Sequence, residues 1–209
     1  MSSVRIGSSA PLKITIMSTT FLTADTHFGH NGVCVFLRQD GTKLRPWNNA
    51  EEMDEAMVKL WNDTVRPKDK VYVLGDLVIN RKAINSVMPR LNGEKVLIKG
   101  NHDIFKLNEY VPYFKDIRGY HVISGMIMSH IPIHSDSLAR FGCNIHGHLH
   151  EKRVMLDNKI DPRYFSVSVE CTDFKPISLE EAKIRIEKQG GEINFKQKSA
   201  WGDSNKYID

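Results

Sequence analysis

Strands and helices alternate through the first half of this chain, and that alternation constrains its fold more than any other feature. The expected buried strands lie at residues 20–24, 70–74 and 95–99. Between them, residues 49–64 and 82–91 carry apolar side chains at helical spacing, and Asn49 is expected to cap the first of these helices. This order is typical of parallel strands joined by helices, so the sequence predicts an α/β fold.

The second half of the chain predicts mostly short strands. Residues 120–123 and 126–129 flank Ser124-Gly125 and are expected to form a hairpin. Further strands are expected at residues 143–145, 164–169 and 193–196. The segment Ser178-Leu-Glu-Glu181 is a capping box, so a helix should start there and end near residue 187.

Length and composition fit one globular domain of ordinary size. The chain has 209 residues, of which 41% are hydrophobic and 26% charged, and these proportions exclude extended disorder. We expect a single domain over residues 18–197, a flexible extension over 1–17 and a polar tail over 198–209. Met17 is a candidate for the native start, because the first strand follows it closely.

Neither a membrane nor an oxidising compartment is expected for this chain. No stretch approaches the roughly 18 apolar residues of a membrane span, and the N-terminal residues lack the apolar core of a signal peptide. The cysteines at positions 34, 143 and 171 are odd in number and far apart. We therefore expect a cytoplasmic protein, whose net charge of +4 suits a phosphate-bearing ligand.

Five polar clusters follow expected strands directly. They are Asp25-Thr-His27, Gly75-Asp76, Gly100-Asn-His-Asp103, His130 and Gly147-His-Leu-His150. In open α/β sheets, ligands collect beyond the carboxyl ends of the strands, so these clusters should converge on one place. Each cluster alone is a weak signal, but their ordered combination strongly favours a functional site.

The clusters bring carboxylates, an amide and several imidazoles but no thiolate. This donor set suits Mn²⁺, Fe, Zn²⁺, Co²⁺ or Ni²⁺ better than Ca²⁺ or a structural zinc ion. Seven candidate ligands are too many for one ion and about right for two ions that share a bridging group. Asp76 is the natural bridge, because each carboxylate oxygen can reach one ion.

At this point the sequence resembles the calcineurin-like metallophosphoesterases, whose motif blocks match residues 21–176. The segments Asp25-Thr-His-Phe-Gly-His30, Arg45-Pro-Trp47 and Val169-Glu170, with Pro176-Ile177 after them, resemble a compact bacterial and phage branch of that family. The resemblance implies a four-layer α/β/β/α sandwich of two mixed sheets. It also implies a dinuclear metal centre in the loops at the strand ends.

The resemblance assigns roles by matching motif. One metal ion would be held by Asp25, His27, Asp76 and His150. The other would be held by Asp76, Asn101, His130 and His148. The two ions, with Mn²⁺ as the first choice, would lower the pKa of a bridging water and so supply hydroxide.

His102 resembles the catalytic histidine of the family, which protonates the leaving oxygen. Asp103 is expected either to orient His102 or to cap a helix starting at Ile104. Possible substrate contacts are Asn101, His30, Arg45, Arg81 and His134. For the last four, packing or solvation at the surface is the competing interpretation.

The function expected from the site is hydrolysis of phosphate esters by two metal ions. No inserted cap domain is evident, so the site should be open and favour phosphodiesters of the nucleotide type. A phosphomonoesterase acting on nucleotides or proteins is the alternative, as is a nuclease, although no basic tract marks a nucleic-acid groove. A non-catalytic scaffold is disfavoured because no ligand position is lost. Nucleic acid stays open as a partner, and so does a homo-oligomer that could close the site.

Overall fold

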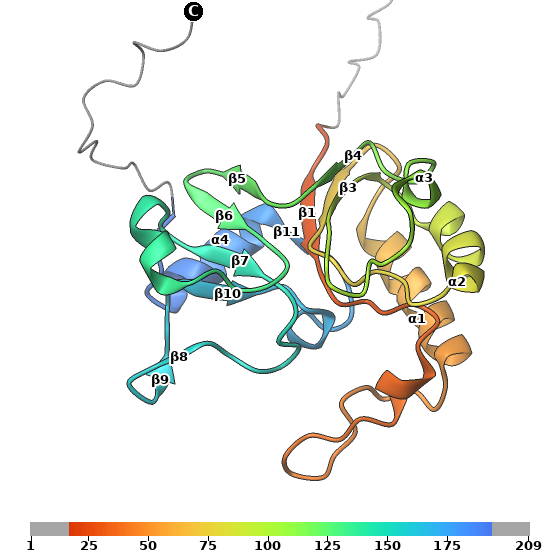
Figure 1. The fold of residues 1–209 in the computed structure, drawn as a ribbon, viewed down its shortest axis with the longest axis horizontal. Coiled ribbons are helices and arrows are strands. Elements are labelled where there is room, and N and C mark those ends of the chain that lie inside the picture. The colour runs from red at the N-terminus through yellow and green to blue at the C-terminus, as the bar shows by residue number, and fades with distance from the viewer. Residues whose placement is uncertain (1–16, 194–209) are drawn as a thin grey trace, which may run out of the picture.

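The computed structural model describes residues 17–193, which fold around two β-sheets (Figure 1). The first sheet has the strand order β11-β1-β2-β3-β4. Its strands are β1 (Thr20–Thr23), β2 (Lys70–Val73), β3 (Glu94–Ile98), β4 (Asp116–Arg118) and β11 (Ile177–Ser178). Strands β1 to β4 are parallel, and β11 runs antiparallel to β1, so the sheet is mixed.

The second sheet has the order β10-β7-β6-β5 and is also mixed. Its strands are β5 (His121–Ile123), β6 (Met126–Met128), β7 (Asn144–His146) and β10 (Tyr164–Ser166). The expected hairpin joins β5 and β6, and Ser124 and Gly125 both adopt left-handed backbone conformations at its turn. A separate two-stranded ribbon is formed by β8 (Met155–Leu156) and β9 (Lys159–Ile160).

Three helices lie on the right of Figure 1, beside the first sheet. They are α1 (Ala50–Thr64), α2 (Arg81–Ser86) and α3 (Leu107–Tyr110). The fully buried Trp61 of α1 packs in one apolar cluster with Val71 and Val73 of β2. The side chain of Asn49 accepts a hydrogen bond from the Glu52 amide and caps α1 as expected.

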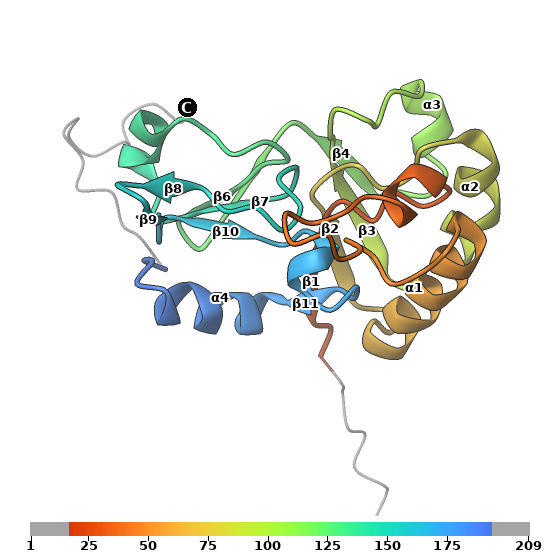
Figure 2. The same cartoon turned by 90° about the horizontal axis from the view of Figure 1, so that it is seen from below.

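Two helical segments pack against the second sheet, one α-helix and one 3-10 helix. Helix α4 (Leu179–Lys188) begins at Ser178, whose Oγ accepts a hydrogen bond from the Glu181 amide. Its apolar side chains join the cluster between the two sheets, and Figure 2 shows α4 running along the second sheet. The 3-10 helix η3 (Ser135–Arg140) packs Leu138 against Ile127 in a third cluster. No helix within residues 17–193 is long and apolar enough to cross a bilayer.

The expected fold of two mixed sheets with helical layers is confirmed, while several element boundaries differ. Helix α2 ends at Ser86, and a 3-10 turn (Met88–Arg90) containing Pro89 replaces its expected last turn. Strands β4, β8, β9 and β11 and helix α3 are too short to leave a periodic signal. The strand expected at 193–196 lies almost entirely outside the described residues, as do most of the expected N-terminal extension and all of the polar tail.

The carboxyl ends of the two sheets meet, and this junction positions the site. Ala24, directly after β1, forms a parallel bridge with Ser168, which lies just beyond β10. The Ala24 amide donates to the Val167 carbonyl oxygen at 3.0 Å, and the Val169 amide donates to the Ala24 carbonyl oxygen at 3.1 Å. Loops that leave strands of both sheets therefore come together.

At the other end of the first sheet, Asp69 directly precedes β2 and joins two neighbouring loops by hydrogen bonds. Its carboxylate accepts hydrogen bonds from the Thr19 amide, the Arg66 amide and the Arg66 guanidinium, and the residue is only 1% exposed. The hydrogen bonds from Arg66 outweigh the effect of burial and lower the pKa of Asp69 to about 2.

We expect Asp69→Asn to lower the free energy of unfolding by about 1–3 kcal/mol, because the Thr19 and Arg66 donors lose a charged acceptor. The folded-state pKa of Asp69 is depressed, so its contribution is complete above the ordinary carboxyl pKa and disappears as the pH falls through about 2. Urea unfolding of both proteins from pH 7 down to pH 2 should therefore show a stability difference that narrows in acid. A difference independent of pH would contradict this account.

Candidate metal centre

The loops that follow the strands turn sharply at the candidate ligands themselves. Five of these residues have left-handed backbone conformations, with φ between 50° and 69°: Asp25, His27, Asp76, His148 and His150. Residues other than glycine rarely adopt this backbone conformation, so the surrounding structure must hold it in place. Amide hydrogen bonds across the strand ends do so, from Asp25 to the Gly75 carbonyl and from His27 to the Asp76 carbonyl, both at 3.0 Å.

The first group of candidate ligands contains Asp25, His27 and His150. One ligand atom from each lies within 4.8 Å of the others. The rings of His27 and His150 are stacked, with centroids 5.2 Å apart. Asp25 is fully buried, and its Oδ2 accepts a hydrogen bond from Ser168 Oγ at 2.7 Å.

The second group contains Asp76, His130 and His148, again with ligand atoms within 4.8 Å of one another. Asn101 lies beside it, with Oδ1 2.8 Å from His130 Nε2 and 2.9 Å from His148 Nδ1. His130 Nδ1 faces the Leu74 carbonyl, which can only accept, so Nδ1 carries a proton. Burial alone would lower the pKa of His130, but its contacts with Asp76 raise the pKa above the ordinary value. With Nε2 deprotonated, the ring would offer a lone pair beside the oxygens of Asn101 and Asp76, a donor set that suits a metal cation.

Asp76 links the two groups. Its Oδ2 lies 3.3 Å from His130 Nε2 and 3.7 Å from His27 Nε2, so one carboxylate oxygen faces an imidazole of each group. Its Oδ1 accepts a hydrogen bond from the His102 amide at 2.8 Å. Burial alone would raise the pKa of Asp76, but its contacts with His130 and the His102 amide lower the pKa below the ordinary value.

The chemistry of His27 supports metal binding directly. Within the described part of the chain, neither buried ring nitrogen of His27 has a hydrogen-bond partner. Burial lowers the pKa of His27 to about 3, so the ring is neutral at pH 7, as a metal ligand must be. Burial also raises the pKa of Asp25 to about 6, which still leaves its carboxylate ionised at pH 7. These residues fit a divalent transition metal ion.

Asp103 plays a different part from either role expected for it. The Asp76 and Gly100 amides donate to its Oδ2 at 2.9 and 2.8 Å, and the Leu77 amide donates to its Oδ1 at 3.3 Å. The buried carboxylate therefore ties the loop after β2 to the loop after β3. It caps no helix at Ile104, because α3 begins at Leu107.

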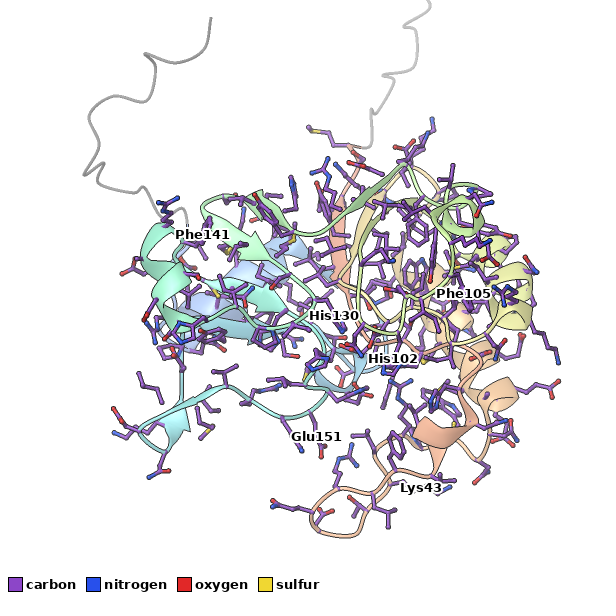
Figure 3. The ribbon with its side chains drawn as sticks, viewed as in Figure 1. Lys43, His102, Phe105, His130, Phe141 and Glu151 are labelled. Atoms are coloured by element: carbon purple, nitrogen blue, oxygen red, sulfur yellow. The ribbon has the colours of Figure 1, made fainter. Side chains whose placement is uncertain are left out.

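His102 lies at the open side of the centre, with its ring centroid 5.5 Å from that of His27. Both His102 and Asn101 are exposed to solvent. In Figure 3 the labelled His102 and His130 lie where the ends of the two sheets meet. A group in this position can reach a ligand that approaches from solvent.

The structure separates the expected substrate contacts. Arg45 is fully buried and faces the protein interior, so it offers no surface to a substrate. Arg81 is two-thirds exposed and pairs with Glu109 at 2.8 Å. His134 is three-quarters exposed and caps η3. His30 lies beside the candidate ligands, with its ring 5.8 Å from that of His27 and its Nδ1 accepting a hydrogen bond from the Val33 amide.

Two residues of the centre were given no role by the sequence. Ser168 supports Asp25, as described above, and Glu170 Oε1 lies 3.0 Å from His150 Nδ1. Glu170 belongs to the Val169-Glu170 segment that resembles the compact branch of the family, which is the signal that could have indicated it.

Gly100 provides a sharp test of the packing around Asp76. A Cβ atom at residue 100 would lie 2.6 Å from the Asp76 backbone nitrogen, closer than real Cβ contacts come. We expect Gly100→Ala to displace Asp76, to weaken metal binding and to lower the expected hydrolysis of phosphate esters by about a hundredfold. Gly119→Ala is the matched control, because a Cβ there meets nothing within 4 Å. Equal metal content and activity in both variants would contradict the expectation.

Comparison with known proteins agrees with this geometry. The family model for calcineurin-like phosphoesterases matches residues 19–179, which is most of the chain. The chain therefore belongs to the calcineurin-like phosphoesterases, a family of metal-dependent phosphoester hydrolases that typically bind two metal ions.

Individual relatives carry names without a function. The chain is 36% identical over 181 residues to an uncharacterized protein of Methanocaldococcus jannaschii, covering 82% of this chain and 93% of that protein. It is 26% identical to the Gene 66 protein of Mycobacterium phage D29, covering 74% of this chain and 89% of the phage protein. A solved structure of a protein of unknown function from Aquifex aeolicus superimposes with a TM-score of 0.59 at 25% identity, covering 79% of this chain and 97% of that one.

Proposed function

We propose that this protein hydrolyses phosphodiesters, of the nucleotide type or other small diesters, with two transition metal ions. The observation that carries the proposal is the pair of three-residue ligand groups that face each other through Asp76. The first ion would be held by Asp25, His27, Asp76 and His150. The second would be held by Asp76, Asn101, His130 and His148.

The donor set guides the choice of metal. It contains imidazole, carboxylate and amide groups and no thiolate, which suits Mn²⁺ first and also Fe, Zn²⁺, Ni²⁺ or Co²⁺. When bound, the ions would activate the attacking water and offset the negative charge of the phosphate oxygens. The three cysteines are all free, which supports a reducing, cytoplasmic setting for this chemistry.

The residues of the chain supply the remaining chemistry. The Asp76 carboxylate holds the His102 backbone through the amide, so the imidazole stays at the open side of the site. From there His102 would donate a proton to the leaving oxygen. Asn101 is exposed next to His102, and the His30 ring lies 5.8 Å from that of His27, so both would contact the phosphate group or its substituents.

The exposure of the site supports diesters over monoesters. His102 and Asn101 are open to solvent, and residues 17–193 contain no domain inserted between the strand-end loops. An ester with two substituents can lie across such a surface, whereas a small monoester gains most from an enclosing pocket. The two candidate ester classes therefore differ in how much protein contact each can make.

Hydrolysis of bis-p-nitrophenyl phosphate and of p-nitrophenyl phosphate tests the proposal directly. The diester should be cleaved faster in Mn²⁺, and EDTA should stop both reactions. Preference for the monoester would keep the two-metal site and reject the diester assignment. No cleavage with Mn²⁺, Zn²⁺, Ni²⁺ or Co²⁺ by protein that binds no metal would overturn the proposal as a whole.

A further inference from the structure

A buried ion pair joins two segments that the active-site motifs do not include. Arg45 Nη2 lies 2.7 Å from Glu170 Oε1, and both side chains are wholly inaccessible to solvent. Arg45 Nε donates to the same oxygen at 2.9 Å, across 125 residues of sequence. Burying two charges is costly, so such a pair needs a reason beyond stability.

The arginine holds the backbone that carries the first two ligands. Arg45 Nη1 donates to the Thr26 carbonyl oxygen at 2.7 Å, and Nη2 donates to the Asp25 carbonyl oxygen at 2.6 Å. These carbonyls belong to the peptide units between Asp25 and His27, where the backbone is left-handed at both ligands. The rigid guanidinium fork thus fixes the turn that aims Asp25 and His27 at one point.

The glutamate holds the third ligand of the same group. Glu170 Oε1 accepts hydrogen bonds from Arg45 Nε and Nη2 and lies 3.0 Å from His150 Nδ1. A carboxylate paired with a guanidinium acts as an acceptor, so this contact places the proton on His150 Nδ1 and leaves Nε2 as the nitrogen that can bind a cation. Carboxylates that fix a liganding imidazole in this way commonly strengthen metal binding.

The second ligand group is supported differently. His130 Nδ1 faces the Leu74 carbonyl oxygen at 2.8 Å, which belongs to the main chain of the strand end. His148 is placed through its amide, which donates to Asp25, and through its ring contact with Asn101. Among the described residues, neither of these histidine rings contacts Arg45 or Glu170.

We propose that Arg45 and Glu170 form a positioning pair that tightens binding of the metal ion held by Asp25, His27 and His150, and leaves the other ion unaffected. This inference rests on the proposed two-metal function. Neither residue touches substrate, so their effect should appear in metal binding without any substrate present.

The test is metal binding by the full chain, measured as stoichiometry after dialysis and as affinity by titration with Co²⁺, followed through its visible absorption. The wild type should bind two ions. Glu170→Gln should bind one ion with unchanged affinity and the other about 10- to 100-fold more weakly. Long-range ¹H–¹⁵N spectra should also show that the His150 ring loses its fixed Nδ1–H form.

Two further proteins make the result decisive. Arg45→Met with Glu170→Gln removes both charges together, avoids leaving a lone buried cation, and should show the same weakened binding of one ion. Asp69→Asn is the matched control, because it removes a buried carboxylate paired with an arginine at the far end of the same sheet. It should lower stability and keep both ions.

The outcomes separate the two proposals. Unchanged binding of both ions in Glu170→Gln and in the double variant, or equal weakening of both ions, would overturn the positioning role while keeping the two-metal function. A wild type that binds fewer than two ions would overturn the two-metal function and this inference with it.

Discussion

Asp76→Asn should lower hydrolysis of bis-p-nitrophenyl phosphate by about a thousandfold or more, since it weakens both metal positions at once. Asp76 is the only carboxylate among the described residues whose one oxygen faces an imidazole of each ligand group, at 3.3 and 3.7 Å. Asparagine carries no charge, so its amide oxygen would bind two cations far more weakly than the Asp76 carboxylate oxygen would. Asparagine tolerates the left-handed backbone as well as aspartate does, so the fold should be kept.

The measurement is kcat with saturating Mn²⁺ together with the metal content of the purified variant. Both should fall, and circular dichroism should match the wild type. Asp54→Asn is a suitable control. Asp54 lies on α1, its carboxylate accepts a hydrogen bond from the Gly29 amide, and it belongs to neither ligand group. An Asp76→Asn protein that binds two ions and turns over within tenfold of the wild type would contradict the bridging role.

His102→Ala should produce a loss that depends on the leaving group. For a dinucleoside monophosphate, whose alkoxide leaving group needs a proton, we expect a loss of about a thousandfold. For bis-p-nitrophenyl phosphate, whose phenolate leaves without help, we expect only about tenfold. The physical reason is the position of His102 at the open side, beside His27 and outside both ligand groups.

The comparison of kcat for the two esters is the readout, and metal content should equal that of the wild type. Asp76→Asn provides the contrast, because a defect in metal binding should reduce both reactions alike. Equal losses on the two esters in His102→Ala would reject proton donation by His102. They would indicate that the imidazole only orders the phosphate.

The order of strands and helices predicted an α/β fold, and the resemblance carried by the strand-end motifs implied two mixed sheets. The sequence could not predict which partners long or charged side chains find in the folded protein. Arg45 was expected at the surface as a substrate contact, yet it lies inside because its partner Glu170 comes 125 residues later. Asp103 follows His102 in sequence, but its carboxylate faces the Asp76 amide across the sheet. Such pairings depend on tertiary structure, which local pattern does not record.

The left-handed conformation of the candidate ligand His27 has a consequence for directed evolution. Glycine at this position would relieve roughly 1 kcal/mol of backbone strain and would remove two buried ring nitrogens that have no hydrogen-bond partner among the described residues. A library screened for heat resistance alone would therefore lose this metal ligand readily. Variants that survive such a screen would be stable but would bind metal poorly, unless metal retention were selected together with stability.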